Sequence, residues 1–284
     1  MTESKNQRVW FITGSSTGFG RDLAERALRR GDKVVATARK PEQIAELADE
    51  FPQTALVLPL DVTSAASIEN AVVGAITKFG RVDVLVNNAG YGLAGAIEEA
   101  TEAEYMPVFE TNVFGLIRLT RAVLPYLRAQ KSGHVVNLSS IGGLIGSPGW
   151  GFYNASKFAV EGFSEALAAE LKPLGIAVTI IEPGPFRTDF LGRSGVEAEA
   201  RIPDYDPTAG KTREYFHDQA GKQPGDPAKA VQAILDVVGA EKPPLHLLLG
   251  KIALTRFRTR LDGWKQELDQ WESLTIGADF PEGE

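Results

Sequence analysis

Apolar and polar positions alternate in a regular order along most of the chain. Short apolar runs rich in Val, Ile and Leu are each followed by a longer stretch whose apolar residues recur three and four positions apart. The first pattern predicts buried strands and the second predicts helices. Strands are expected at 9–13, 33–39, 54–62, 82–86, 177–182 and 245–249, and a further strand begins at 135. Helices are expected at 21–31, 64–79, 102–128, 151–174 and 226–238. Because single helices separate the strands, we expect an α/β fold: a doubly wound parallel sheet of about seven strands with helices on both faces.

The composition favours a single globular domain over residues 1–284. The chain is 43% hydrophobic and 24% charged, which is enough apolar surface for one large core. We place that core at about 8–190. The segment at about 190–226 is polar and rich in Gly and Pro, and it follows a strand of the sheet, so a substrate lid is expected there, with a surface insertion as the alternative.

A C-terminal extension, about 243–284, contains one clear periodic pattern. Apolar residues at 254, 257, 261, 264, 268 and 271 form a single stripe on a helix. We expect this stripe to pack on its own domain or on a sister subunit. Several nearby Arg and Lys residues leave contact with a membrane surface as a less favoured alternative.

A glycine-rich turn, TGSSTGFG, joins the first strand to the first helix. Free N–H groups and the helix dipole at such a turn attract a phosphate, and glycines let the backbone approach a pyrophosphate. A tight turn without a ligand is the alternative. The second strand ends in Ala38-Arg39-Lys40 with no acid, and cations there favour a ribose 2′-phosphate, so NADP(H) is the expected cofactor.

Three reactive side chains follow the strand that begins at 135. Tyr153 and Lys157 are four residues apart on a helix and so lie on one face. An ammonium within about 4–6 Å lowers the pKa of a phenol by about 1–3 units, which would make Tyr153 a better proton donor. Ser140 can hydrogen-bond the same substrate oxygen. Alone, a Tyr and a Lys at this spacing could also be an ordinary helix surface.

Charge and composition exclude several other classes of protein. A net charge of -7 and a pI near 5.2 argue against nucleic-acid binding. The chain has no cysteine, and its three histidines lack the spacing of metal ligands, so no metal site is expected. The sequence has neither a signal-peptide pattern nor an apolar run long enough to span a membrane, and a cytoplasmic location is expected.

Seven motifs in order resemble the classical short-chain dehydrogenase/reductase family, which has a Rossmann fold. They are TGSSTGFG, Asp61-Val62, NNAG, TNVFG, NLSS, YNASK and PGPFRT, and together they span about 9–188. The extension and TARKPE also resemble the hydroxysteroid- and retinol-dehydrogenase-like branch, which implies an apolar substrate.

The resemblance assigns roles to individual residues. It implies that Tyr153 is the general acid/base, that Ser140 fixes the substrate carbonyl, and that Lys157 lowers the pKa of Tyr153 and holds the nicotinamide ribose. It implies that Asn112 anchors a water leading to Lys157. It places at the cofactor Gly14, Ser15, Ser16, Thr17, Gly18, Phe19, Gly20, Arg39, Asp61, Val62, Asn88, Ala89, Gly90, Tyr153, Lys157, Pro183, Gly184, Phe186 and Thr188.

The function expected from this resemblance is hydride transfer between NADP(H) and the carbonyl carbon of an apolar ketone or aldehyde, or the reverse oxidation of a secondary alcohol. An epimerase using the same site and a non-catalytic NADP(H)-sensing regulator are the alternatives. Family members usually pair through their two long helices, so a homodimer or homotetramer is expected.

Overall fold

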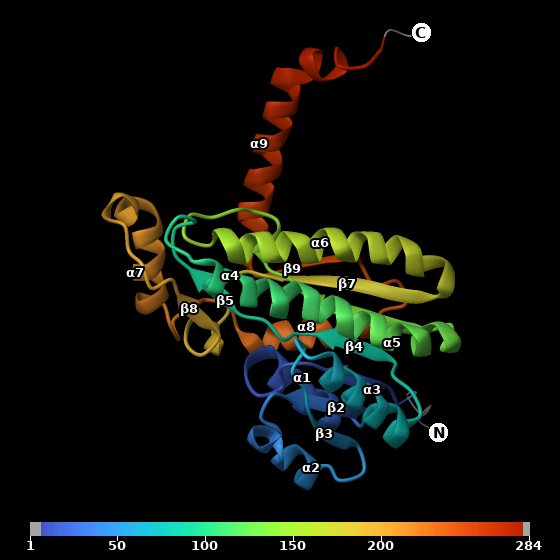
Figure 1. Cartoon of the computed structure of the whole chain (residues 1–284). Helices are drawn as coiled ribbons and strands as arrows, with labels where there is room; N and C mark the ends of the chain where they lie inside the picture. Colours follow the sequence, from blue (N-terminus) through green and yellow to red (C-terminus); the bar gives the residue numbers. More distant parts are fainter. Residues whose placement is uncertain (1–6, 281–284) are drawn as a thin grey trace.

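A seven-stranded parallel sheet forms the centre of the molecule (Figure 1). The computed structural model describes residues 7–280. Its strands are β1 (Val9–Ile12), β2 (Lys33–Ala38), β3 (Ala55–Pro59), β4 (Val84–Asn87), β6 (Gly133–Leu138), β7 (Ile176–Pro183) and β9 (His246–Leu249), in the order β3-β2-β1-β4-β6-β7-β9. Every neighbouring pair is parallel, which confirms the predicted fold class. The strand order reverses between β1 and β4, where ligands bind in open α/β sheets.

Helices cover both faces of this sheet. They are α1 (Gly18–Arg29), α2 (Glu46–Glu50), α3 (Ala65–Phe79), α4 (Glu102–Phe109), α5 (Leu116–Gln130), α6 (Gly151–Leu171), α7 (Lys211–Asp218), α8 (Pro227–Gly239) and α9 (Lys251–Ile276). On one face α1 and α8 bury their apolar sides against the sheet, with Leu23 and Ile234 fully enclosed. On the other face α3, α5 and α6 do the same, for example through Leu119. Each face therefore has its own apolar core.

The helix expected over 102–128 is broken by a π-helical turn at Glu110–Gly115. Pro107 inside α4 lacks an N–H group, and at Gly115 a Cβ would clash with Val62. The wider turn buries Asn112. Such turns occur frequently at functional sites.

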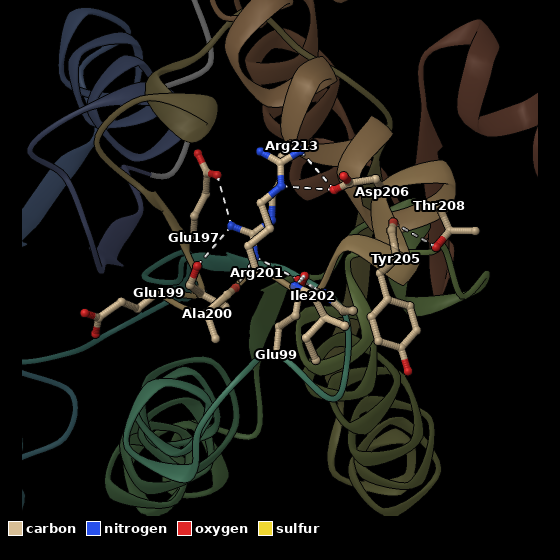
Figure 2. A network of polar contacts seen from close by, with 12 residues as sticks. Glu99, Glu197, Glu199, Ala200, Arg201, Ile202, Tyr205, Asp206, Thr208 and Arg213 are labelled. Atoms are coloured by element: carbon tan, nitrogen blue, oxygen red, sulfur yellow. Dashed lines mark hydrogen bonds and ion pairs between the residues drawn. The ribbon is translucent and has the colours of Figure 1, made fainter.

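The segment after β7 is more ordered than its composition indicates. Strand β8 (Gly195–Glu197) pairs with β5 (Gly92–Ala94), and α7 follows. Together, residues 195–218 form what we call the cover. The Arg213 guanidinium holds it by donating to the Glu99 carboxylate at 2.8 Å and to the carbonyl groups of Ala198 and Ala200 at 2.9 and 3.0 Å (Figure 2).

The C-terminal helix α9 leaves the body of the molecule (Figure 1). Only its first turns pack on the body: Ala253 is buried, and Arg256 donates to the Ser147 hydroxyl at 2.8 Å. The expectation that the apolar stripe packs on its own domain is therefore wrong beyond these turns, because the leucines and tryptophans further along remain exposed.

Replacing Arg213 with Ala should destabilise the cover. The Arg213 and Glu99 side chains are 11% and 2% exposed, so the change leaves a buried carboxylate without its cation, at a cost of about 3 kcal/mol. Urea unfolding and limited proteolysis between β8 and α8 would measure the loss. The control is Arg201→Ala, whose ion pair with Asp206 is largely exposed and should contribute less than about 1 kcal/mol. Equal effects of the two changes would contradict this account.

Candidate active site

A large cleft opens at the carboxyl ends of the central strands. Its volume is about 1470 Å³, and it runs from the glycine turn after β1 to the cover and the base of α9. Nearly all residues that the motifs place at the cofactor or the reacting centre line it. Three do not reach its surface: Ser15, Gly20 and Asn112.

The glycine turn has the shape that its sequence requires. Gly14 and Gly18 have φ values of +66° and +56°, which favour glycine. At Gly20 a Cβ would collide with the Asn88 amide and with the Gly14 carbonyl. Asn88 itself donates to the carbonyl groups of Thr13 and Gly14 at 2.8 and 3.1 Å. The loop after β4 therefore holds the glycine turn in place through these hydrogen bonds.

The N-terminus of α1 fits a pyrophosphate. Thr17 precedes the helix but makes no side-chain cap, and the first turn contains no acidic residue. The first N–H groups of α1 therefore face the cleft without a capping side chain, as an anion site requires. Ser15, by contrast, is buried, and its hydroxyl donates to the Ile12 carbonyl at 3.1 Å. Its role is to shape the turn.

Two charged residues stand at the other end of this binding surface. Arg39, just past the end of β2, is exposed and lines the cleft. The Asp61 carboxylate accepts hydrogen bonds from the Thr63 hydroxyl at 2.7 Å and the Thr63 N–H at 2.9 Å. These bonds, helped by the charge of Arg39, lower the pKa of Asp61. Contact of these two side chains with the adenosine half of a dinucleotide stays a prediction.

The Asn112 side chain is buried and makes its hydrogen bonds within the protein. Its amide accepts from the Tyr91 N–H at 3.0 Å and donates to the Tyr91 carbonyl at 2.8 Å and to the Ser156 hydroxyl at 3.0 Å. A Cβ at Gly90 would lie 2.9 Å from Asn112 Oδ1 and 3.6 Å from Lys157 Nζ, so both groups border the same small space. Asn112 therefore ties the π-helical turn to α6 and to the loop after β4.

Tyr153 is enclosed by aromatic side chains. The rings of Trp150 and Phe190 both lie 5.4 Å from it, centre to centre. Burial raises the pKa of Tyr153 to about 12, although a hydrogen bond with the Ser140 hydroxyl lowers it in part. The Lys157 ammonium lies 5.8 Å from the centre of the ring. Its expected effect on the pKa of Tyr153 stays a prediction, because the net upward shift is dominated by desolvation.

Lys157 is also buried. Its Nζ donates to the Leu138 carbonyl at 2.7 Å, at the end of β6. Burial lowers its pKa to about 8, while the nearby Glu161 carboxyl raises it in part. At neutral pH the ammonium form therefore still predominates.

A group of acidic side chains behind Lys157 is not indicated by the motifs. Glu161 follows Lys157 by one helical turn, Glu182 is buried near the end of β7, and His246 Nδ1 lies 2.6 Å from Glu182 Oε1. Burial raises the pKa of Glu161 to about 7 and also raises that of Glu182. The sequence feature that indicates Glu161 is its spacing of four residues from Lys157, which places both side chains on one face of α6. One ligand atom from each of the three lies within 4.8 Å of the others, so the expectation of no metal site stays a prediction.

Fold and cleft together define an α/β oxidoreductase with a dinucleotide-binding site. The family model described as short chain dehydrogenase matches residues 8–198. The chain therefore belongs to the short-chain dehydrogenase family, whose members act on CH–OH and C=O groups. This confirms the resemblance carried by the seven motifs.

Several known proteins are similar over nearly the whole chain. Oxidoreductase BOA17 of Botryotinia fuckeliana is 39% identical, covering 95% of this chain and 99% of its own. 3-Ketodihydrosphingosine reductase of Bacteroides thetaiotaomicron is 38% identical, covering 88% and 90%. Human retinol dehydrogenase 8 is 39% identical, covering 84% and 80%.

Two solved structures share the fold. A short-chain dehydrogenase from Streptomyces avermitilis is 45% identical, covers 96% of this chain and 100% of its own, and superimposes with a TM-score of 0.91. A short-chain dehydrogenase/reductase from Burkholderia phymatum, in complex with NAD, is 25% identical, covers 92% and 95%, and gives a TM-score of 0.81. Among residues 7–280, no helix has both the length and the apolar character needed to cross a bilayer.

Replacing Glu161 with Gln should stabilise the protein at pH 8.5 and much less at pH 5. The pKa of Glu161 is raised from 4.5 to about 7, so the stability that its protonated form contributes is fully present below pH 4.5 and is lost as the pH rises from there through 7. A neutral amide avoids that loss, with a gain on the order of 1–3 kcal/mol at pH 8.5.

Thermal unfolding at pH 5 and pH 8.5, in the presence of a chelator, would measure this difference. Glu165→Gln, one turn further along α6 and 57% exposed, is the control and should change little at either pH. A Glu161→Gln variant with the same relative stability at both pH values would contradict a raised pKa.

Proposed function

We propose that this protein is an NADP(H)-dependent carbonyl reductase, or secondary alcohol dehydrogenase, for an apolar ketone or aldehyde. The observation that carries the proposal is the buried Tyr153 phenol, in hydrogen-bonding contact with Ser140 and close to Lys157. These three groups line one cleft together with the glycine turn. They are the proton donor, the oxygen-binding group and the cation that such a reaction needs.

Each residue has a separate task in the proposed reaction. Bound NADPH would supply the hydride. Tyr153 gives its proton to the substrate oxygen, and the Ser140 hydroxyl donates a hydrogen bond to that oxygen as negative charge develops on it. Lys157, held by the Leu138 carbonyl, offers donors to the cofactor ribose and a charge that favours the phenolate left behind. Asn112 holds the loop beside Lys157 in place.

The direction we propose is carbonyl reduction. NADPH generally serves as the cellular reductant, which favours this direction. At neutral pH the Tyr153 phenol is protonated, so it carries the proton that the substrate oxygen has to receive.

The substrate end of the cleft supports an apolar substrate. Aromatic and aliphatic side chains line it, among them Ile141, Trp150, Phe190, Leu191 and Tyr215. Desolvation of an apolar chain against such a surface favours binding. The names of two relatives, a 3-ketodihydrosphingosine reductase and a retinol dehydrogenase, support the same reading and the proposed branch.

The position of Arg39 supports NADP(H) as the cofactor. It lies at the end of the second strand, where an acid would bind a ribose 2′-OH and a cation accommodates a 2′-phosphate. The Burkholderia relative is in complex with NAD, and a similar serine dehydrogenase structure is in complex with NADP+. The choice of cofactor in this chain therefore rests on Arg39.

We also propose a homodimer or homotetramer formed through α5 and α6. Phe114, in the π-helical turn just before α5, and Phe158, on α6, are each 42% exposed, and such large apolar side chains are suited to an interface. The chain is proposed to be one domain acting in the cytoplasm, with the cover as the lid of the substrate end.

Changing Tyr153 to Phe should remove the reaction and keep cofactor binding. Loss of a general acid costs about 10²–10⁴-fold in rate. Turnover would be followed by NADPH absorbance with a panel of bulky ketones, aldehydes and steroids, and binding by NADPH fluorescence. Tyr126→Phe, outside the cleft, is the matched control. Unchanged behaviour of the Tyr153→Phe protein would favour the sensing regulator.

Changing Arg39 to Ala should reduce the preference for NADPH. Hydrogen bonds to a charged group contribute about 1.5–3 kcal/mol, so kcat/KM for NADPH should fall about 10- to 100-fold while that for NADH changes by less than about 3-fold. Lys40→Ala, at an exposed neighbour that does not line the cleft, should leave the ratio unchanged. An equal loss with both cofactors would show that Arg39 does not contact a 2′-phosphate.

A further inference from the structure

Helix α9 carries an apolar stripe that nothing in the described chain covers. It runs over 26 residues, of which only Ala253 is buried. Leu261, Trp264, Leu268 and Trp271 are 45%, 43%, 65% and 56% exposed. Exposed apolar patches of this kind indicate a binding surface. The stripe therefore points to a partner outside its own chain.

The spacing of the stripe is that of a coiled coil. Leucines occupy one core position of the seven-residue repeat, at 254, 261 and 268, and aromatic residues occupy the other, at 257, 264 and 271. A repeat of alternating three- and four-residue steps keeps one seam facing a second helix. The partner expected from this pattern is another helix with matching side chains.

Charge divides α9 into two unlike halves. Residues 251–260 contain four basic and no acidic side chains, whereas 261–276 contain four acidic side chains and one basic. Two copies lying antiparallel would place the basic half of each against the acidic half of the other. Two copies lying parallel would place like charges together.

We propose that α9 is a self-association helix, which pairs antiparallel with α9 of a second copy of this chain. The pairing is centred between Leu261 and Trp264. This contact is separate from the one proposed for α5 and α6.

Side-chain size supports the antiparallel direction. In this register every core layer joins a leucine to an aromatic residue: Leu254 meets the partner's Trp271, Leu261 meets the partner's Trp264, and Leu268 meets the partner's Phe257. A parallel pair would instead stack Trp264 and Trp271 on their own copies and leave the leucines facing leucines. Alternating large and smaller side chains fill a two-helix core with fewer gaps and less strain.

The flanking charges select the same register. Arg260 lies beside the partner's Glu267, and Lys251 lies beside the partner's Glu272, each contact occurring twice. Arg258 beside the partner's Lys265 is the like-charged contact. Sliding one helix by seven residues brings Arg260 against its own copy, or Glu267 against its own copy, according to direction. A parallel, in-register pair places Arg260 beside the partner's Lys265 and Glu267 beside the partner's Glu272, so both contacts repel.

A membrane surface fits the helix less well. Interfacial helices carry basic residues along their polar face, which anionic lipid head groups attract. In α9 the half that projects furthest from the body contains Glu267, Asp269 and Glu272, which such a surface would repel. An antiparallel second copy, by contrast, places opposite charges against both halves of α9.

Cysteine cross-linking tests the direction and the register, since the chain contains no cysteine. Phe257→Cys and Leu268→Cys full-length proteins would be made alone and coexpressed, then oxidised. We expect a disulfide-linked dimer only in the coexpressed pair, because residue 257 of one copy faces residue 268 of the other. Thr259→Cys coexpressed with Gln266→Cys, at the same level but on the outward face, is the control and should give none.

Other outcomes would overturn the proposal. Cross-linking of each single variant with itself would indicate a parallel pair, and no cross-link in any sample would exclude pairing of α9. Binding of the unmodified protein to phosphatidylserine vesicles, together with no cross-link, would assign the stripe to a lipid surface.

Charge reversal gives an independent measurement. Arg260→Glu and Glu267→Arg should each weaken self-association at least about 10-fold in sedimentation across a concentration series, and the double variant should return to within about 3-fold of the unmodified protein. In a parallel pair the single changes would strengthen association instead. Three variants indistinguishable from the unmodified protein would contradict an α9 interface.

Discussion

The parallel pairing of β1, β4, β6 and β7 is the constraint on which the site depends. Because all four strands run the same way, their carboxyl ends meet at one edge, and the loops that follow them must share one cleft. The glycine turn, the Asn88 loop, Ser140 and Pro183 come from separate strands and reach this edge. Asn88 and Asn112 then fasten these loops to one another through their amide groups.

Burial sets the chemistry of the reacting centre more than direct pairing of charges does. Tyr153, Lys157 and Glu161 lie on one face of α6, and desolvation moves the pKa of each toward its neutral form. At neutral pH the Tyr153 phenol is therefore protonated and Glu161 is only partly ionised, whereas the Lys157 ammonium keeps most of its charge. The sheet, by enclosing α6 from behind, supplies this environment.

Sequence alone predicted the sheet and its parallel order of strands and helices, because glycine turns and short motifs determine local backbone shape. All but three of the predicted site residues line the cleft, but many of its other lining residues belong to no motif. Sequence alone did not predict the π-helical turn at Asn112, since the sequence from 102 to 128 has continuous helical spacing. It also missed the raised pKa of Tyr153, because desolvation depends on Trp150 and Phe190 closing around the ring. The ordered cover and the projecting α9 depend on contacts between distant residues, which no local pattern contains.

The ion pair between Arg213 and Glu99 determines how the cover responds to acid. Burial raises the pKa of Glu99, but the Arg213 guanidinium and the N–H groups of Ile202 and Ala96 outweigh this and hold it at about 2. The carboxylate therefore stays ionised, and bonded to Arg213, through any acidification that a cell compartment reaches. Acid therefore does not release this contact between the cover and the segment that carries Glu99.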